Sequence, residues 1–248
     1  MTGDIYGIEK WGKDFFKILS NGNLGLLNPL KINSKPVDLT KIVKKLNQKL
    51  SPPYIIRVSD YLEFMINEIN QNFNKSIKTI GYKNKFKSVY PIKVNQQSQV
   101  IKKVVKYSKK FNSGLEVGSK AELLIALSQN LTKNALIVCN GTKDEEFIKL
   151  SLLSNKIDMK TILVIESLKE LNLIIKLSQS LNIKPLLGIR IKLTNLISGK
   201  WSQSSGDRSA FGLPVDKITE ALTNLKKNKL LDCLILQHSH LGSQVPDI

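Results

Sequence analysis

From about residue 86 to the end of the chain, short apolar runs alternate with longer amphipathic stretches. The runs are almost continuously apolar, which is typical of strands buried on both faces of a parallel sheet. The stretches between them place apolar residues on one helical face and lysines on the other, as in residues 100–111. The predicted strands are SVYPIKVN (88–95), GLEVGS (114–119), ALIVCNG (135–141), TILVIES (161–167), PLLGIRIKL (185–193) and DCLILQHSHLGS (232–243).

Serine or threonine followed three residues later by glutamate marks three of the predicted junctions from strand to helix. The tetrapeptides are Ser119–Glu122, Thr142–Glu145 and Ser167–Glu170. In such a capping box the hydroxyl accepts a hydrogen bond from an early helical N–H group, and the glutamate reaches back to the cap. A single tetrapeptide is weak evidence, but three in succession predict repeated strand–helix units.

Six such units favour an α/β fold in which residues 81–248 form an incomplete (β/α)8 TIM-type barrel. A Ser/Gly-rich insertion at 196–212 separates the fifth strand from a helix predicted over 215–227. The last residues, PDI, follow a strand end where a helix is expected, so we expect the barrel to be truncated after about six strands. A doubly wound open sheet is the alternative, but no glycine-rich fingerprint follows the first strand.

The first 80 residues have a different pattern and are predicted to form a separate N-terminal segment. An Asn21-Gly22 turn joins two short predicted strands. A helix is expected over 39–50, a strand over 52–58 and a second helix over 61–73. Few strands of this kind are stable alone, so we expect the segment to need partners elsewhere in the protein.

The chain carries 38 Lys and Arg against 20 Asp and Glu, a formal charge of +18. Such an excess raises the alternative of a basic nucleic-acid-binding protein. The lysines are nonetheless scattered through every segment and rarely stand beside aromatic residues, which argues against a basic stripe or a stacking platform. We therefore expect neither nucleic acid nor a membrane as a partner.

The sequence also favours a cytoplasmic location. The N-terminus lacks the apolar core of a secretory signal, and no apolar run approaches the roughly 20 residues that span a bilayer. The two cysteines, Cys139 and Cys233, stand inside apolar runs and are predicted to be buried strand residues rather than a disulfide.

Lys93 stands near the C-terminal end of the first predicted barrel strand, the end at which a barrel carries its chemistry. Partial desolvation there would favour the neutral amine that Schiff-base chemistry needs. Position alone does not separate this role from that of a lysine kept at a strand end for solubility.

His238 and His240 are the only histidines, and both fall at the end of the sixth predicted strand. Strand alternation places both side chains on one face, which we expect to be the inner one. Two histidines at this spacing can ligate a metal, but no Cys or carboxylate cluster lies beside them in the sequence. Gly242 and Ser243 offer a tight turn and a hydroxyl suited to a phosphate or carboxylate, although an ordinary strand-to-helix turn explains them as well.

Glu116 and Arg190 are charged residues inside otherwise apolar strands. Charges are seldom buried without partners, so we expect these two to face the barrel mouth or to pair with each other or with a ligand. A structural ion pair and a functional role are equally open at this point.

Taken together, these segments resemble biosynthetic arginine decarboxylases, within the alanine-racemase-like barrel class of pyridoxal-phosphate enzymes. YPIKVNQ is highly specific when it occurs together with the other matching stretches. The insertion at 196–212 points to the arginine branch rather than to ornithine or diaminopimelate decarboxylases. The matching stretches are WGKDFF, PPYIIRVSDYL, YPIKVNQ, LEVGSKAELL, LIVCNG, LGIRIKL, SGKWSQSSGDRSAFGL and HSHLGSQ.

The resemblance implies an enzyme that decarboxylates L-arginine to agmatine for polyamine synthesis, with pyridoxal phosphate as cofactor and magnesium as a second cofactor of many members. It implies that Lys93 forms the Schiff base, that His240 stacks on the pyridine ring and that Ser243 helps to bind the phosphate. Glu116 and Arg190 match charged positions that line the cofactor site. The class also implies a homo-oligomer, at least a dimer.

Members of this class are much longer than 248 residues. The resemblance therefore implies that the glycine-rich phosphate loop, the acid paired with the pyridine nitrogen, the Cys/Asp segment that completes the site across a dimer and a C-terminal β-domain lie outside this chain. Residues 1–80 would belong with that β-domain, and the 248 residues alone are expected to be poorly stable and inactive. Ser239 is a mild departure, because a bulkier apolar residue is expected there. A diaminopimelate or ornithine decarboxylase is the alternative of the same fold.

Overall fold

The structure is a computed structural model of the chain, and it describes residues 5–12, 14–31, 33–193 and 211–241. The chain forms two compact units, Met1–Lys85 and Phe86–Ile248. This division follows Lys85, whereas the sequence analysis placed the boundary after residue 80. The two units are described separately below.

The first unit contains a small antiparallel sheet and several helices. Its strands are β1 (Phe16–Ile18), β2 (Leu24–Leu26) and β3 (Val37–Asp38), in the order β1-β2-β3, and its helices are α2 (Ile8–Gly12), α3 (Leu39–Asn47) and α4 (Ser59–Ile80). The predicted turn at Asn21-Gly22 is confirmed, because it joins β1 to β2 with Gly22 at a φ of 78°. Glycine adopts this left-handed conformation without the steric cost that a side chain would add.

One predicted strand in this unit is wrong. Residues 52–58 carry no regular secondary structure and pair with no strand in the part of the chain that the structure describes. The segment opens with Pro52-Pro53, and proline cannot donate a hydrogen bond to a neighbouring strand. Ile55 is 78% exposed, so the apolar character that suggested a strand does not correspond to burial.

The second unit is built on a six-stranded parallel sheet in the order β4-β5-β6-β7-β8-β9. The strands are β4 (Val89–Pro91), β5 (Gly114–Val117), β6 (Leu136–Cys139), β7 (Lys160–Ile165), β8 (Leu186–Ile191) and β9 (Leu234–Ser239). The helices are α5 (Ser98–Ser108), α6 (Lys120–Leu127), α7 (Glu145–Lys156), α8 (Leu168–Leu181) and α9 (Val215–Lys227), with 3-10 turns η1 (Ile92–Val94), η2 (Lys109–Phe111) and η4 (Leu231–Cys233). All six predicted barrel strands are confirmed, as is the helix over 215–227.

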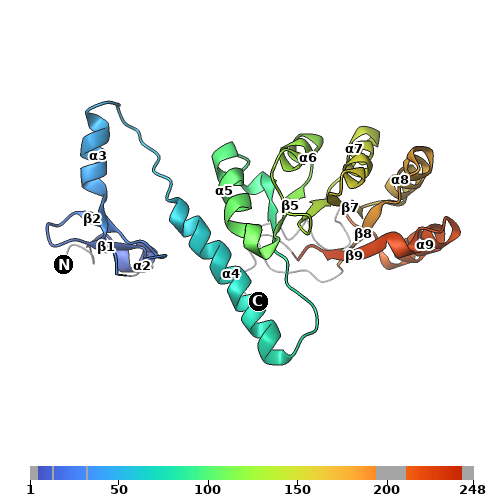
Figure 1. Cartoon of the computed structure of the whole chain (residues 1–248), viewed down its shortest axis with the longest axis horizontal. Coiled ribbons are helices and arrows are strands. Elements are labelled where there is room, and N and C mark those ends of the chain that lie inside the picture. The colour runs from blue at the N-terminus through green and yellow to red at the C-terminus, as the bar shows by residue number, and fades with distance from the viewer. Residues whose placement is uncertain (1–4, 13, 32, 194–210, 242–248) are drawn as a thin grey trace. The chain divides into compact units, whose positions relative to one another are not determined.

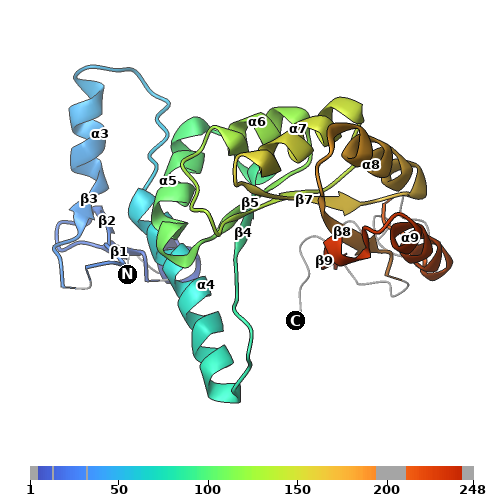
Figure 2. The same ribbon diagram turned by 45° about the vertical axis from the view of Figure 1, so that its right-hand side comes forward.

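The strands follow one another across the sheet in chain order, and Figures 1 and 2 show α5 to α8 gathered on one side of it. A doubly wound sheet would reverse its strand order and carry helices on both faces. The unreversed order, the parallel register and the one-sided helices therefore confirm the α/β prediction of an incomplete (β/α)8 barrel. β4 and β9 form the two edges of this sheet.

Strand β7 shows why the barrel strands are almost continuously apolar. Ile162, Leu163, Val164 and Ile165 are no more than 2% exposed. Successive residues face the helices and the inside of the curved sheet in turn, and both sides exclude water. Full burial of such a side chain contributes roughly 1.5–3 kcal/mol. The central strands are thus tightly packed, and they hold in place the residues at their C-terminal ends.

Two of the three predicted helix caps are confirmed. Ser119 accepts a hydrogen bond from the Glu122 N–H at 3.2 Å, and Ser167 accepts one from the Glu170 N–H at 3.2 Å. The glutamate of the first box reaches one residue further back than predicted, because the Glu122 carboxylate accepts from the Gly118 N–H at 2.7 Å. The caps fix where α6 and α8 begin, directly after the strand ends.

The third predicted capping box is wrong. Helix α7 begins at Glu145, and its cap is Asp144 rather than Thr142. Asp144 accepts a hydrogen bond from the Phe147 N–H at 2.9 Å. Aspartate caps a helix as well as a hydroxyl residue does. The later start leaves Lys143 outside the helix, in the turn after β6.

Lys143 is fully buried in that turn. Its Nζ donates to the carbonyl oxygens of Gly141 at 2.6 Å and Val164 at 2.7 Å. It also lies 2.8 Å from Glu170 Oε1, and the two side chains are 0% and 4% exposed. Burial raises the pKa of Glu170, and the neighbouring ammonium opposes that shift. This ion pair ties the turn after β6 to β7 and α8.

Lys143→Met is expected to lower the free energy of unfolding by about 3–5 kcal/mol, because it leaves the Glu170 carboxylate buried without its cation. Lys149→Met is the matched control. Lys149 pairs with Glu145 on the surface of α7, with side chains 46% and 56% exposed, and its loss is expected to cost less than about 1 kcal/mol. Denaturant unfolding of the full-length protein compares the two variants, and equal losses would contradict the prediction.

Candidate functional site

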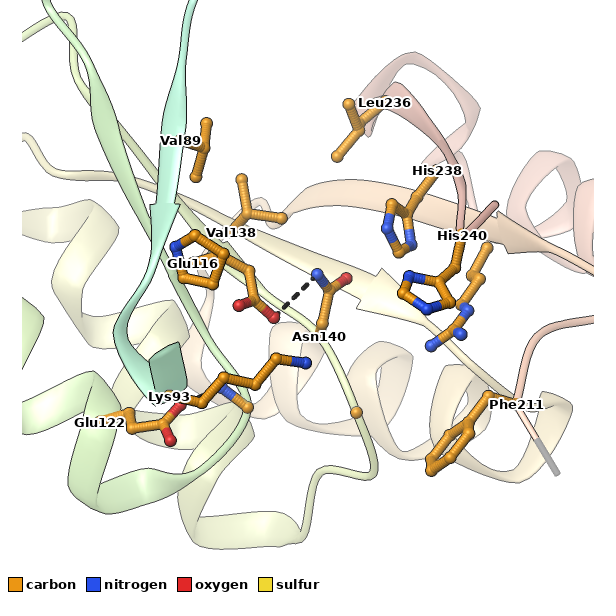
Figure 3. Close-up of a pocket in the computed structure, with 14 residues that line it drawn as sticks. Val89, Lys93, Glu116, Glu122, Val138, Asn140, Phe211, Leu236, His238 and His240 are labelled. Atoms are coloured by element: carbon orange, nitrogen blue, oxygen red, sulfur yellow. Dashed lines mark hydrogen bonds between the residues drawn. The ribbon is translucent and has the colours of Figure 1, made fainter. Parts of the chain in front are cut away.

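A pocket of about 690 Å³ opens at the C-terminal ends of the strands in the second unit. This volume falls within the range of small-molecule sites, about 300–1,000 Å³. Side chains from β4 and η1, β5, β6, β8 and β9 converge on it, as Figure 3 shows. The charged and imidazole residues that line it are Lys93, Glu116, Glu122, Arg190, His238 and His240.

Lys93 lines the pocket, but it does not lie in a strand as predicted. Strand β4 ends at Pro91, and the chain continues into η1, where Ile92 is fully buried. The buried Ile92 anchors the turn, and Figure 3 shows the amine of Lys93 directed toward Asn140. Lys93 itself is exposed, so the expected partial desolvation is wrong for this structure. The reason is its place at the rim, beyond an edge strand of the sheet.

Glu116 faces the pocket from β5 and is 9% exposed. Its Oε1 accepts a hydrogen bond from Asn140 Nδ2 at 3.1 Å, drawn in Figure 3. Glu116 Oε2 and Asn140 Oδ1 are buried and have no hydrogen-bond partner within the described ranges. Sequence reasoning missed Asn140, although a polar residue at the end of the apolar run ALIVCN was the available signal.

Arg190 lines the pocket from β8, and its ionic partner is Glu166 rather than Glu116. Its Nη1 lies 3.1 Å from Glu166 Oε1 and 3.4 Å from Oε2. Of the alternatives open for Glu116 and Arg190, pairing with each other is therefore wrong, because Arg190 turns toward the neighbouring strand β7. Facing the pocket is confirmed, because both residues line it. The guanidinium also stacks on the Phe211 ring, with 5.2 Å between the guanidinium carbon and the ring centre.

Glu166 follows β7 directly and is a functional candidate that sequence reasoning did not single out. Besides the Arg190 guanidinium, it accepts hydrogen bonds from the Gly141 N–H at 2.9 Å and the Gly212 N–H at 3.1 Å. Its side chain is 5% exposed. One carboxylate thus joins donors from three segments, which fixes the orientation of Arg190 at the pocket. A carboxylate immediately after a buried strand was the available signal.

His238 and His240 both line the pocket, which confirms that they face the same side at the end of β9. Burial and the positive charge of Arg190 lower the pKa of both imidazoles, and Lys93 adds to this effect. Both rings are therefore mainly neutral at pH 7. His238 Nδ1 is buried and has no partner among the described atoms.

Metal binding by these histidines finds no support in the part of the chain that the structure describes. No group of three or more His, Cys, Asp or Glu side chains there is arranged to hold a metal ion. Gly242 and Ser243, the predicted turn and phosphate-binding hydroxyl, lie outside the described residues. The same is true of most of the insertion at 196–212.

The two cysteines are not among the residues that line the pocket. Cys139 and Cys233 are buried and free, and Cys139 lies in β6 as predicted, whereas Cys233 lies in η4 rather than in a strand. Burial raises the pKa of Cys139 to about 12, so it stays a thiol at neutral pH. Within the described ranges, no helix combines the length and the apolar character that a membrane crossing requires.

The chain is similar to proteins named biosynthetic arginine decarboxylase. It is 43% identical over 244 residues to the one from Prochlorococcus marinus (strain MIT 9312), covering 98% of this chain and 38% of that protein. It is 42% identical over 246 residues to the one from Phocaeicola vulgatus, covering 99% of this chain and 39% of that protein. The chain therefore spans about two fifths of the length of the relatives that it matches.

Solved structures give the same relationship. The biosynthetic arginine decarboxylase of Campylobacter jejuni superposes with a TM-score of 0.82 at 37% identity, covering 96% of this chain and 37% of that chain. The diaminopimelate decarboxylase of M. jannaschii superposes with a TM-score of 0.65 at 22% identity, covering 96% of this chain and 50% of that chain. The second likeness shows the shared fold alone.

A family model identifies the part of the chain that carries the pocket. Residues 66–248 match the model described as pyridoxal-dependent decarboxylase, pyridoxal binding domain. The match includes every strand of the parallel sheet and all the residues that line the pocket. The chain therefore belongs to the pyridoxal-dependent decarboxylases, and residues 66–248 correspond to their pyridoxal-binding domain.

Proposed function

We propose that the full-length protein is a pyridoxal-phosphate-dependent arginine decarboxylase, which converts L-arginine to agmatine and carbon dioxide. The proposal is carried by the similarity to proteins named biosynthetic arginine decarboxylase, at 43% identity over 98% of the chain. A diaminopimelate or ornithine decarboxylase is the alternative of the same fold, and the diaminopimelate decarboxylase of M. jannaschii is 22% identical. The formal charge of +18 would suit nucleic-acid binding, but no arrangement of the described residues supports it.

The pocket suits pyridoxal phosphate in its chemistry. Lys93 places a primary amine at the rim, where it can bond to an aldehyde. His240 presents an imidazole that can lie against an aromatic ring. Glu116, Asn140 and His238 line the pocket, and each has a buried atom, Oε2, Oδ1 and Nδ1 respectively, that finds no hydrogen-bond partner in the part of the chain that the structure describes. An unsatisfied buried polar atom costs about 1–3 kcal/mol, so three of them in residues that line one pocket favour a polar ligand there.

In this proposal the residues of the pocket have distinct roles. When bound, the cofactor supplies an electron sink for the charge left by the loss of carbon dioxide. Lys93 holds the cofactor covalently, His240 stacks on its ring, and Ser243 helps to bind its phosphate, the last from the family resemblance alone. Arg190 keeps one orientation beside the pocket because Glu166 and Phe211 hold it. A fixed cation needs no reorganisation during the reaction.

The remaining parts of the proposal rest on the family resemblance. The full-length protein would act in the cytoplasm, in polyamine synthesis, as a dimer or larger homo-oligomer, without nucleic acid or membrane as a partner. Magnesium enters on the same ground, since the described residues contain no side-chain group arranged for a metal ion. Residues 1–80 would belong with a C-terminal β-domain, and residues 1–248 alone are expected to be inactive.

Full-length protein supplied with pyridoxal phosphate is expected to release agmatine from L-arginine, and to act on L-ornithine and diaminopimelate about 10²-fold more slowly or less. Lys93→Ala is expected to lower turnover about 10³-fold or more, because it removes the covalent anchor. Lys169→Ala, which changes an exposed lysine of α8, is the control and should keep full activity. Chromatography of the products measures all three substrates. Faster turnover of another amino acid, or an active Lys93→Ala variant, would refute the assignment.

Acid is expected to destabilise the folded protein through His238 and His240. Their pKa values in the folded chain lie below the usual 6.5, so the unfolded chain takes up protons first as the pH falls. The stability that depends on their neutral rings is therefore complete above about pH 6.5 and declines as the pH drops below it. Urea unfolding between about pH 7.5 and pH 5.5 measures this slope. The double variant His238→Gln/His240→Gln should give a flatter profile, and an unchanged slope would count against the prediction.

A further inference from the structure

Two residues that line the pocket each have a buried acceptor oxygen with no hydrogen-bond partner among the described residues. The two oxygens are Glu116 Oε2 and Asn140 Oδ1, and Glu116 is nine-tenths buried. The hydrogen bond from Asn140 Nδ2 to Glu116 Oε1, 3.1 Å long, fixes the orientation of both groups. The reverse amide orientation would set two oxygens against each other, so the chemistry requires that the second oxygen of each group points elsewhere.

The pairing of the strands places Lys93, which carries a primary amine, near Glu116 and Asn140. Glu116 pairs in register with Pro91 on β4 and with Val138 on β6. Lys93 and Asn140 each stand two residues beyond these partners, just past the ends of β4 and β6, the strands that flank β5. Figure 3 shows the Lys93 side chain extended beside Glu116 with its amine directed toward Asn140.

The two oxygens select the chemistry of what they bind. Carboxylate and amide oxygens accept hydrogen bonds and cannot donate them. An anion would be repelled by Glu116, and a neutral acceptor would leave both oxygens unsatisfied. A protonated primary amine carries three N–H donors, no acceptor and one positive charge. Such a group satisfies both oxygens at once and neutralises the buried carboxylate. Arg190 does not fill this place, because its guanidinium is paired with Glu166.

We propose that Glu116 and Asn140 form a binding site for a protonated primary amine, with Glu116 supplying the charge and Asn140 the second acceptor. Two sources of this amine share the same chemistry. One is the side chain of Lys93, and the other is the amino group of a small-molecule ligand.

This inference deepens the proposed function, and its role in catalysis rests on that function. An amino-acid substrate enters with a protonated amine, and its nitrogen must replace that of Lys93 on the cofactor. The bond from the Lys93 nitrogen to the cofactor would break as the bond from the substrate nitrogen forms, and the substrate ammonium would give up two protons to the Lys93 nitrogen, which would leave as an ammonium. The site would hold the ammonium before the exchange, when the substrate carries it, or after the exchange, when Lys93 does.

Chemical labelling of Lys93 tests the first source in the full-length protein freed of pyridoxal phosphate. A limiting acylating reagent at about pH 8 reacts with the free amine, and a bound ammonium is protected. Glu116→Gln is expected to raise the rate of labelling at Lys93 about tenfold, because the amine loses its charged hydrogen-bond partner and is then free to react. Asn140→Leu should raise the rate by a smaller factor. Glu220→Gln, which removes a surface carboxylate paired with Lys217, should leave it unchanged.

Titration with n-propylamine tests the second source in the same cofactor-free protein. Calorimetry should show binding to the wild type and binding about tenfold weaker to Glu116→Gln. Faster labelling or weaker propylamine binding in Glu116→Gln supports the proposal and identifies the source. Neither change, in a variant with the wild-type melting temperature, overturns it. If Glu116→Gln fails to fold, Asn140→Leu gives the same two readings. Because neither readout uses turnover, an inactive wild type would refute the proposed function and leave this inference standing.

Discussion

Two buried carboxylates, one directly after β7 and one in the first turn of α8, hold the neighbouring strand ends together. Glu166 is neutralised by Arg190, and Glu170, four residues further on, is neutralised by Lys143. Both pairs also bind the same residue, because Gly141 donates its N–H to Glu166 and accepts a hydrogen bond from Lys143 through its carbonyl oxygen. A carboxylate removed from water needs such partners, and losing one costs several kcal/mol. The ends of β6, β7 and β8 therefore cannot move independently.

The pocket depends on this anchoring. Gly141, with a φ of 72°, turns the chain after β6 and stands next to Asn140. The position of Asn140 in turn sets the orientation of Glu116 through their hydrogen bond. On the other side, Glu166 sets the orientation of Arg190. The C-terminal ends of the parallel strands all lie at the same end of the sheet, so side chains from distant parts of the sequence meet there. Lys93 contrasts with them, because it is exposed in η1, just past the end of the edge strand β4.

Patterns within a few residues predicted much of this fold. The six barrel strands were recognisable because both of their faces are buried, which makes each a continuous apolar run. Relations between distant residues were not recognisable in the same way. Nothing in the sequence shows that Arg190 turns toward Glu166, or that Asn140 bonds to Glu116, since both depend on side-chain direction across neighbouring strands. The strand predicted over 52–58 was wrong because an apolar run does not reveal whether a pairing partner exists.

Reduction with borohydride of the full-length protein loaded with pyridoxal phosphate, followed by peptide mapping, tests whether the strand ends form a cofactor site centred on Lys93. The expected result is one label, on the peptide that contains Lys93, and its loss in Lys93→Ala. A folded protein that carries no label, or a label spread over many lysines, would contradict the assignment of the pocket as the site of pyridoxal phosphate.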